Sequence, residues 1–260
     1  MTHIAHAPDG YVKTEVHNHI ATIEFFHPQS NSLPGKLLYE LAHEITVAGN
    51  NNVARVIVLR SVGEKAFCAG ASFAELVAIK NEAEGLQFFS GFAYVINAMR
   101  HCNKFIIARI QGKCVGGGVG LAAAADYAFA TEHADVKLSE LAIGIGPFVI
   151  GPAVERKIGL GAFSQLSINA TEWQTAAWAH AKGLFTELHA HSHDMDKSIA
   201  KLAGTLAACN PEAMAEMKKM FWHGTHNWNE LLGERAAISG RLVLSDFSKK
   251  AIEAFKAKAK

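Results

Sequence analysis

The sequence is short of net charge, of cysteine and of long apolar runs. Its 25 lysines and arginines are balanced by 24 aspartates and glutamates, so the net charge of +1 gives no reason to expect an extended polyanion such as nucleic acid as a partner. The four cysteines, Cys68, Cys102, Cys114 and Cys209, form no C-x-x-C pair, which argues against a disulfide framework and a zinc knuckle. We therefore expect reduced thiols and no metal.

Signals for export or membrane insertion are also missing. Residues 1–10 contain no lysine or arginine and no apolar stretch of the kind that a secretory signal needs. The charge-free segment 141–154 is broken by three glycines and two prolines, and it is shorter than the about 20 residues of a membrane helix. These absences predict a cytoplasmic protein without a membrane partner.

The chain does contain enough apolar residues for one large globular unit, because half of its 260 residues are hydrophobic. β-rich runs occur at residues 11–16, 19–26, 55–60, 104–110 and 127–130, the first two as a hairpin, and helical spacing occurs at 37–48, 73–80 and 86–99. Strands that alternate with helices indicate an α/β domain. Helix formers dominate from about residue 195, with Pro211 placed for a first helical turn, so we expect a core over 1–200 and a helical subdomain over 201–260.

Glycines are concentrated in the segment CVGGGVGL, residues 114–121, between a predicted strand and an Ala-rich helix. Glycine lets the backbone approach a ligand closely, and a helix that begins there would present free N–H groups to an anion or an oxyanion. The alternative is that the glycines only allow close helix–sheet packing. A dinucleotide motif G-x-G-x-x-G fails, because Leu121 stands where the last glycine is needed.

A second glycine-bearing loop, KAFCAGASFAEL at residues 65–76, also leads from a strand into a helix. Two such loops can supply two converging N–H donors, which is what a carbonyl oxygen requires when it becomes an oxyanion. Cys68 and Cys114 flank the loops without an evident base, so small-residue packing explains them best.

These loops, together with motifs in a fixed order along nearly the whole chain, resemble the crotonase (enoyl-CoA hydratase/isomerase) superfamily. The motifs are HPQSNSL at 27–33, A-x-x-x-EL at 71–76, GGG at 116–118, Asp126, SE at 139–140, GIGP at 144–147 and AFKAK at 254–258. The resemblance implies a ββα superhelix (spiral) core with a helical C-terminal trimerisation subdomain, and a homotrimer or a dimer of trimers. It also implies an acyl-CoA substrate, with coenzyme A as part of the substrate and no separate cofactor.

The resemblance also implies the site residues. The backbone N–H groups of Ala71 and Gly117 would form an oxyanion hole for the thioester, and Glu140 would be the catalytic acid/base. Gly117→Val is expected to block the thioester oxygen. The positions implied in substrate or CoA binding are Ala69, Ser72, Phe73, Gly116, Gly120, Ser139, Phe148, Phe255 and Lys258. Lysines near the C-terminus could contact CoA phosphates, or could simply complement a helix dipole.

One departure from the family bears on the mechanism. The family's hydratases use two carboxylates, and here the first position is Gly120 while the second is Glu140. One carboxylate can remove and return a proton, so Glu140 alone favours double-bond isomerisation. Hydration with a substitute water-activating group, decarboxylation, or a catalytically reduced acyl-CoA binding protein are the alternatives. We expect Gly120→Glu to raise hydratase activity.

Several candidates have plainer interpretations. If the family resemblance is set aside, Glu140 is expected to be an ordinary exposed glutamate. Phe148 stands where the family commonly has glycine, and it could either narrow the acyl pocket or simply pack in the core. His189, His191 and His193 lack a carboxylate or cysteine partner, which favours a solvated polar loop over a metal site.

Overall fold

A six-stranded sheet forms the centre of the fold. The computed structural model describes residues 8–258, and side chains as far as residue 254. The sheet has the order β1-β2-β3-β5-β7-β9, in which β1 and β2 form an antiparallel hairpin and all other neighbours are parallel. Its strands are β1 (Tyr11–His17), β2 (Ile20–Phe26), β3 (Val56–Ser61), β5 (Ile106–Ile110), β7 (Tyr127–Thr131) and β9 (Glu187–His189). The predicted hairpin and α/β class are confirmed.

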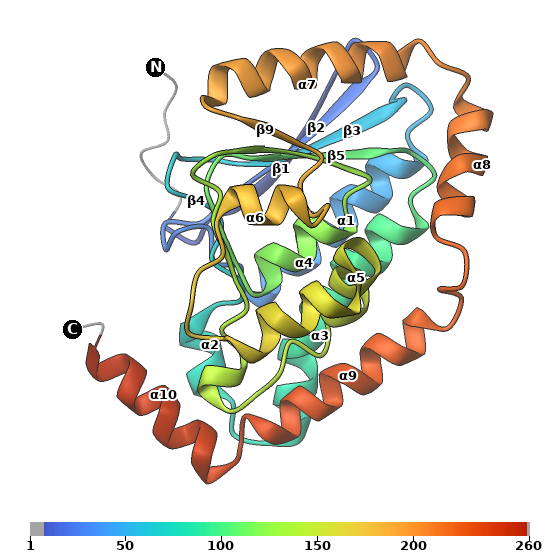
Figure 1. The fold of residues 1–260 in the computed structure, drawn as a ribbon. Coiled ribbons are helices and arrows are strands. Elements are labelled where there is room, and N and C mark those ends of the chain that lie inside the picture. Colours follow the sequence, from blue (N-terminus) through green and yellow to red (C-terminus); the bar gives the residue numbers. More distant parts are fainter. Residues whose placement is uncertain (1–7, 259–260) are drawn as a thin grey trace.

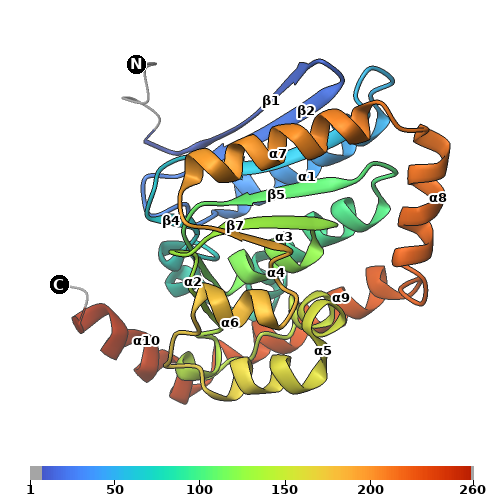
Figure 2. The same ribbon diagram turned by 45° about the horizontal axis from the view of Figure 1, so that its top comes forward.

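Both faces of this sheet are covered, which explains why β3 is apolar from Val56 to Leu59. Ile57 faces a large core that includes α1 (Gly35–Asn50), α3 (Glu82–His101) and α4 (Gly117–Ala124). Val56 and Val58 face the opposite way, toward α7 (Ser192–Ala207), as the alternation of side chains along a strand requires. Figures 1 and 2 show α7 lying across the sheet on the side away from α1 and α4.

A second, smaller sheet holds the segments of greatest interest. It consists of three parallel strands in the order β4-β6-β8, namely β4 (Ala66–Cys68), β6 (Lys113–Val115) and β8 (Val136–Lys137). None of these three strands was predicted, since the sequence indicated only glycine-bearing loops at β4 and β6 and no element at β8. Short helices follow two of the strands: α2 (Phe73–Ala78) comes after β4 and η1 (Leu141–Ile143) after β8.

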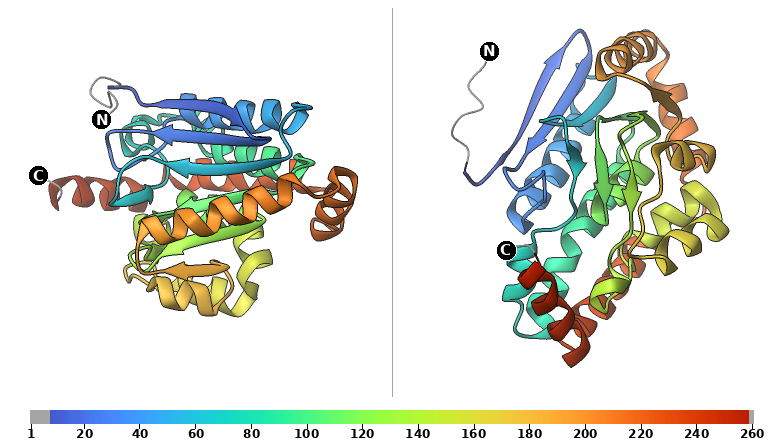
Figure 3. Two further views of the ribbon diagram at one scale, coloured as in Figure 1. Left: turned by 90° about the horizontal axis from the view of Figure 1, so that it is seen from above. Right: turned by 60° about the vertical axis from the view of Figure 1, so that its left-hand side comes forward.

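Helices dominate the rest of the chain. They are α5 (Gly151–Ile168), α6 (Ala176–Ala181), α8 (Pro211–Phe221), α9 (Trp228–Leu242) and α10 (Asp246–Lys258). As predicted, α8 begins at Pro211, with the Asn210 side chain accepting the N–H groups of Glu212 and Ala213. From α8 onward the chain runs around one side of the core (Figures 1 and 3), with α9 against α3. The division expected at residue 200 falls inside α7, which packs on the large sheet.

The expectation that His189, His191 and His193 lie in one solvated polar loop is wrong. His189 ends β9, with its ring centroid 5.9 Å from that of Phe129, while His191 precedes α7 and His193 lies in its first turn. Among the described residues, no three His, Cys, Asp or Glu side chains gather as metal ligands would. Within the same residues, none of the helices combines the length and apolar character needed to cross a membrane.

Candidate active site

A cavity of about 1160 Å³ lies where the strands of the small sheet end. Its wall includes Ala69 and Ala71 after β4, Gly116 and Gly117 after β6, and Ser139 and Glu140 after β8. Because neighbouring parallel strands end at the same edge of a sheet, three segments far apart in the sequence meet here. A backbone hydrogen bond joins two of them directly, since the N–H of Gly116 donates to the carbonyl of Lys137 at 2.9 Å.

Two backbone N–H groups at this edge are free to bind a ligand. Leu33 N–H donates to the Gly70 carbonyl at 2.8 Å, and Ser72 N–H donates to the Leu33 carbonyl at 3.1 Å. These bonds hold the loop on both sides of Ala71, whose own N–H meets no acceptor among the described residues. The same is true of Gly117 N–H at the start of α4, as expected for a first-turn donor. Both residues line the cavity, so these two donors are available to a group bound there.

Close approaches explain why Gly116 and Gly117 must be glycines. Gly116 has a φ of +51°, and a Cβ there would lie 2.9 Å from Glu140 Oε1. A Cβ on Gly117 would lie 2.1 Å from the ring of Phe92, which lines the cavity. The expected effect of Gly117→Val therefore needs correction: its side chain points at Phe92, so it would first displace the cavity wall.

The third glycine of the run has a packing role. A Cβ on Gly118 would lie 2.3 Å from the carbonyl oxygen of Cys68, so here the alternative of close packing holds. Cys68 and Cys114 are completely buried beside it. Burial raises the pKa of the Cys68 thiol to about 12 and that of Cys114 well above its usual value, which makes both thiols inert, as the sequence suggested.

Glu140 is held at the edge of the cavity by its own main chain. Its carbonyl accepts the N–H groups of Ile143 at 3.2 Å and Ile145 at 3.1 Å, which fixes the start of η1. Its Oε2 is buried and has no hydrogen-bond partner in the described part of the chain, so the alternative of an exposed glutamate is wrong. Burial raises the pKa of Glu140 to about 7, so this carboxyl group can both take up and release a proton near neutral pH.

Gly120 lies inside α4 and is fully buried, and it is not among the described lining residues. A Cβ there would lie 2.6 Å from Cγ2 of Ile150, which does line the cavity. A glutamate at position 120 therefore requires Ile150 to move, and the expected gain in hydratase activity stays a prediction. Glu140 is the only carboxylate among the described residues that line the cavity.

The rest of the wall is aromatic and aliphatic. Phenylalanines form much of it, namely Phe73, Phe88, Phe89, Phe92 and Phe148. Phe148 thus faces the cavity, as the pocket interpretation predicted. Ser72 does not line it: this residue is 3% exposed, and its Oγ accepts the N–H of Glu75 as the N-cap of α2.

The C-terminal helices contribute residues that the sequence did not indicate. Ser239 of α9 and Ala251 and Ala254 of α10 line the cavity. The first turn of α10 packs on η1, since a Cβ on Gly144 would lie 2.5 Å from Ser248 Oγ. Ser239 and Ala251 belong to no motif, and Ala254 was noted only as the first residue of AFKAK, so the paths of α9 and α10 decide that they reach the site. Two predicted positions on this helix, Phe255 and Lys258, have side chains outside the described residues.

The site combines two free backbone N–H donors with one buried carboxyl group in a two-sheet α/β core. Such groups can stabilise an enolate, because N–H donors favour the negative charge on its oxygen. The chain belongs to the enoyl-CoA hydratase/isomerase family, whose sequence model matches residues 15–260.

Individual relatives agree with this family. YngF of Bacillus subtilis (strain 168), named as an enoyl-CoA hydratase/isomerase, is 32% identical over 214 residues, 81% of this chain and 80% of its own. Carnitinyl-CoA dehydratase of Proteus mirabilis is 26% identical over 203 residues, 75% of this chain and 73% of its own. The crystal structure of an enoyl-CoA hydratase from Bacillus halodurans shares the fold, with a TM-score of 0.87 at 21% identity over 94% of this chain and 99% of that one.

Proposed function

We propose that the protein isomerises the double bond of an enoyl-CoA thioester through an enolate. The N–H groups of Ala71 and Gly117 bind the thioester oxygen, and Glu140 moves the proton. The observation that carries this proposal is the buried, unpartnered Oε2 of Glu140, the only carboxylate among the described lining residues. A pKa of about 7 suits a group that must act as base and then as acid in one turnover.

The reaction needs only one carboxyl group. Glu140 takes a proton from C2 of a 3-enoyl-CoA, and the electron pair moves onto the thioester oxygen, which the two N–H groups stabilise. The resulting dienolate regains the proton at C4, so the double bond moves from C3–C4 to C2–C3 and Glu140 returns to its ionised form. No water, oxidant or second acid enters the balance.

Hydration makes a further demand that this cavity meets poorly. It needs one group to activate water and another to protonate the α-carbon. In this chain the position that supplies the family's other carboxylate is Gly120, and Ile150 occupies the space into which a side chain there would extend. Both features favour isomerisation over hydration.

Parallel assays test the proposal. Purified protein is given a 3-enoyl-CoA and a 2-trans-enoyl-CoA, and the products are followed by chromatography. We expect isomerisation to exceed hydration, and Glu140→Gln to lower its rate by roughly 10²–10⁴-fold, the usual range for an acid/base group. Glu234→Gln, an exposed change on α9, is the matched control. Faster hydration would refute the assignment.

A binding protein that has lost catalysis is the remaining alternative. Exchange of the α-hydrogen for deuterium, measured by mass spectrometry on an acyl-CoA, separates it from an enzyme. Exchange that Glu140→Gln abolishes supports catalysis, whereas no exchange with any chain length refutes it. On the family resemblance we also propose a homotrimer or a dimer of trimers, with coenzyme A entering only as part of the substrate.

A further inference from the structure

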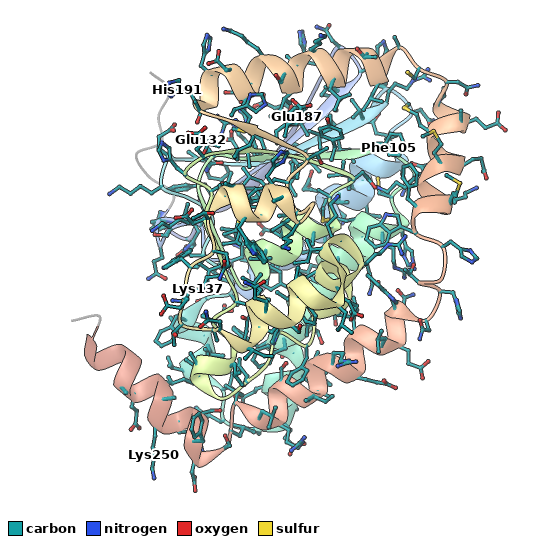
Figure 4. All side chains as sticks on the ribbon, in the orientation of Figure 1. Phe105, Glu132, Lys137, Glu187, His191 and Lys250 are labelled. Atoms are coloured by element: carbon teal, nitrogen blue, oxygen red, sulfur yellow. The ribbon has the colours of Figure 1, made fainter. Side chains whose placement is uncertain are left out.

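A second cavity lies at the other end of α3. It has a volume of about 590 Å³ and is bounded by the last turn of α3, by α8 and by the loop before α9. In Figure 4, Lys137 marks the side of the candidate active site, and Phe105, which stacks on Phe221 of α8, marks the opposite side. Its charged and titratable lining residues are Arg100, His101, Lys218, Lys219, His223 and His226, together with Cys102. No aspartate or glutamate is among the described lining residues.

Arg100 is one of two buried cations that line this cavity, with 9% of its surface exposed. It donates four hydrogen bonds: Nε and Nη2 to Asn97 Oδ1 at 3.2 and 3.1 Å, Nη1 to the Thr225 carbonyl at 3.0 Å, and Nη2 to Asn229 Oδ1 at 2.8 Å. All of these acceptors are neutral. A guanidinium group has five N–H donors, so one Nη1–H is left. Buried charges in proteins are normally paired, but no carboxylate in the described chain forms a hydrogen bond or an ion pair with Arg100.

The other cations near Arg100 do not supply it with a negative partner. Lys218 is buried but neutralised, with its Nζ 2.8 Å from Asp126 Oδ2, and Lys219 forms an exposed ion pair on its own helix. The guanidinium carbon of Arg156 lies 5.3 Å from the centroid of a Trp222 ring, and Trp222 also lines the cavity. Like Arg100, Arg156 has no carboxylate partner in the part of the chain that the structure describes. Arg100 and Arg156 are therefore the two cations of this region without a counter-ion among the described residues.

We propose that this cavity binds a compact oxyanion, a phosphate or carboxylate group, with Arg100 at its base. The remaining Nη1–H gives the anion a charge-assisted hydrogen bond in a site of low dielectric, where such bonds are strongest. Lys219, His101 and His223 at the rim add donors. The site is separate from the acyl-CoA cavity, with which it shares no described lining residue.

Calorimetric titration of the full chain at fixed ionic strength tests this site, with sodium phosphate in one arm and sodium acetate in the other. We expect saturable binding in at least one arm, and the stronger arm identifies the preferred group. Arg100→Gln should weaken it by at least about tenfold, the loss expected for a hydrogen bond to a charged group. The double variant Lys219→Gln/His223→Gln changes only exposed rim residues and should also weaken binding.

Lys201→Gln is the charge-matched control, since it removes one exposed lysine from α7. It should bind the anion as the unmodified protein does. The proposal is overturned if neither anion binds saturably, or if the control weakens binding as much as the rim variant does. It is overturned as well if the rim variant leaves binding intact, a test that stands even if Arg100→Gln fails to fold. The mass in solution is measured by sedimentation for the same variant. If the rim variant changes this mass and leaves anion binding unchanged, the positive charge serves contacts between copies of this chain, and the proposal is wrong.

Discussion

Glu140→Gln should stabilise the protein at alkaline pH while it removes activity. Burial raises the pKa of Glu140 to about 7, against 4.5 for the free side chain. Between these values the folded state holds a proton that the unfolded state has lost, so the stability of the folded protein falls as the pH rises through this window. A glutamine side chain has nearly the same shape but no charge, so the variant does not lose stability by ionisation as the pH rises.

The magnitude follows from the shift. A difference of about 2.5 pKa units corresponds to about 3 kcal/mol once both states are fully ionised. At pH 8 the variant should therefore gain about 3 kcal/mol over the unmodified protein, relative to the gap between the two at pH 4.5. For a chain of this size such a gain raises the melting temperature by about 6 °C or more. Thermal unfolding of both proteins at the two pH values measures it.

A second glutamate provides the control for this stability prediction. Glu234→Gln, which changes an exposed glutamate, should show the same gap at both pH values. If the gap between Glu140→Gln and the unmodified protein is independent of pH, or if it shifts in favour of the unmodified protein between pH 4.5 and pH 8, Glu140 does not carry a raised pKa. The same ionisation should appear as a limb near pH 7 in the dependence of kcat/KM on pH, with activity rising as the base ionises.

Three further changes test the architecture around the site. Gly117→Ala puts a Cβ 2.1 Å from the ring of Phe92, and we expect steady-state kinetics to give a kcat/KM lower by about 10²-fold or more. Lys218→Met leaves the buried carboxylate that it pairs with at 2.8 Å without its cation, so urea unfolding should show a loss of about 3–5 kcal/mol. Gly240→Ala, whose Cβ would lie 2.7 Å from the α3 backbone, should cost about 1–3 kcal/mol in thermal unfolding. Gly233→Ala on the same helix meets nothing within 4 Å, and equal losses in the two variants would contradict this packing.

Local periodicity was enough to predict the larger elements. The apolar run at β3 and the helical spacing of α1 and α3 are visible in the sequence because each element buries a regular set of side chains. The strands β6 and β8, with three and two residues, are too short to show a period. They are strands only because β6 pairs with β4 on one side and with β8 on the other, which depends on the folded arrangement of distant segments.

The candidate site divides in the same way. The order of motifs indicated Ala71, Gly117 and Glu140, and the structure brings all three to one cavity. No motif indicated that Ser72 caps a helix instead of facing the cavity, since a serine at that position fits either role. Nor did any motif mark Ala251, because a small residue on an amphipathic helix has no chemistry to recognise.

By itself the sequence determined which chemical groups are available: two glycine-bearing loops, one carboxylate at position 140 and none at position 120. These are covalent facts, and they were enough to indicate the family and an enolate-forming reaction. Only the tertiary structure decided that Glu140 Oε2 is buried without a hydrogen-bond partner among the described residues, and that Ile150 fills the space beside Gly120. Desolvation and packing arise from residues far apart along the chain, so the pKa of the carboxyl group and the room for a second one are properties of the folded molecule.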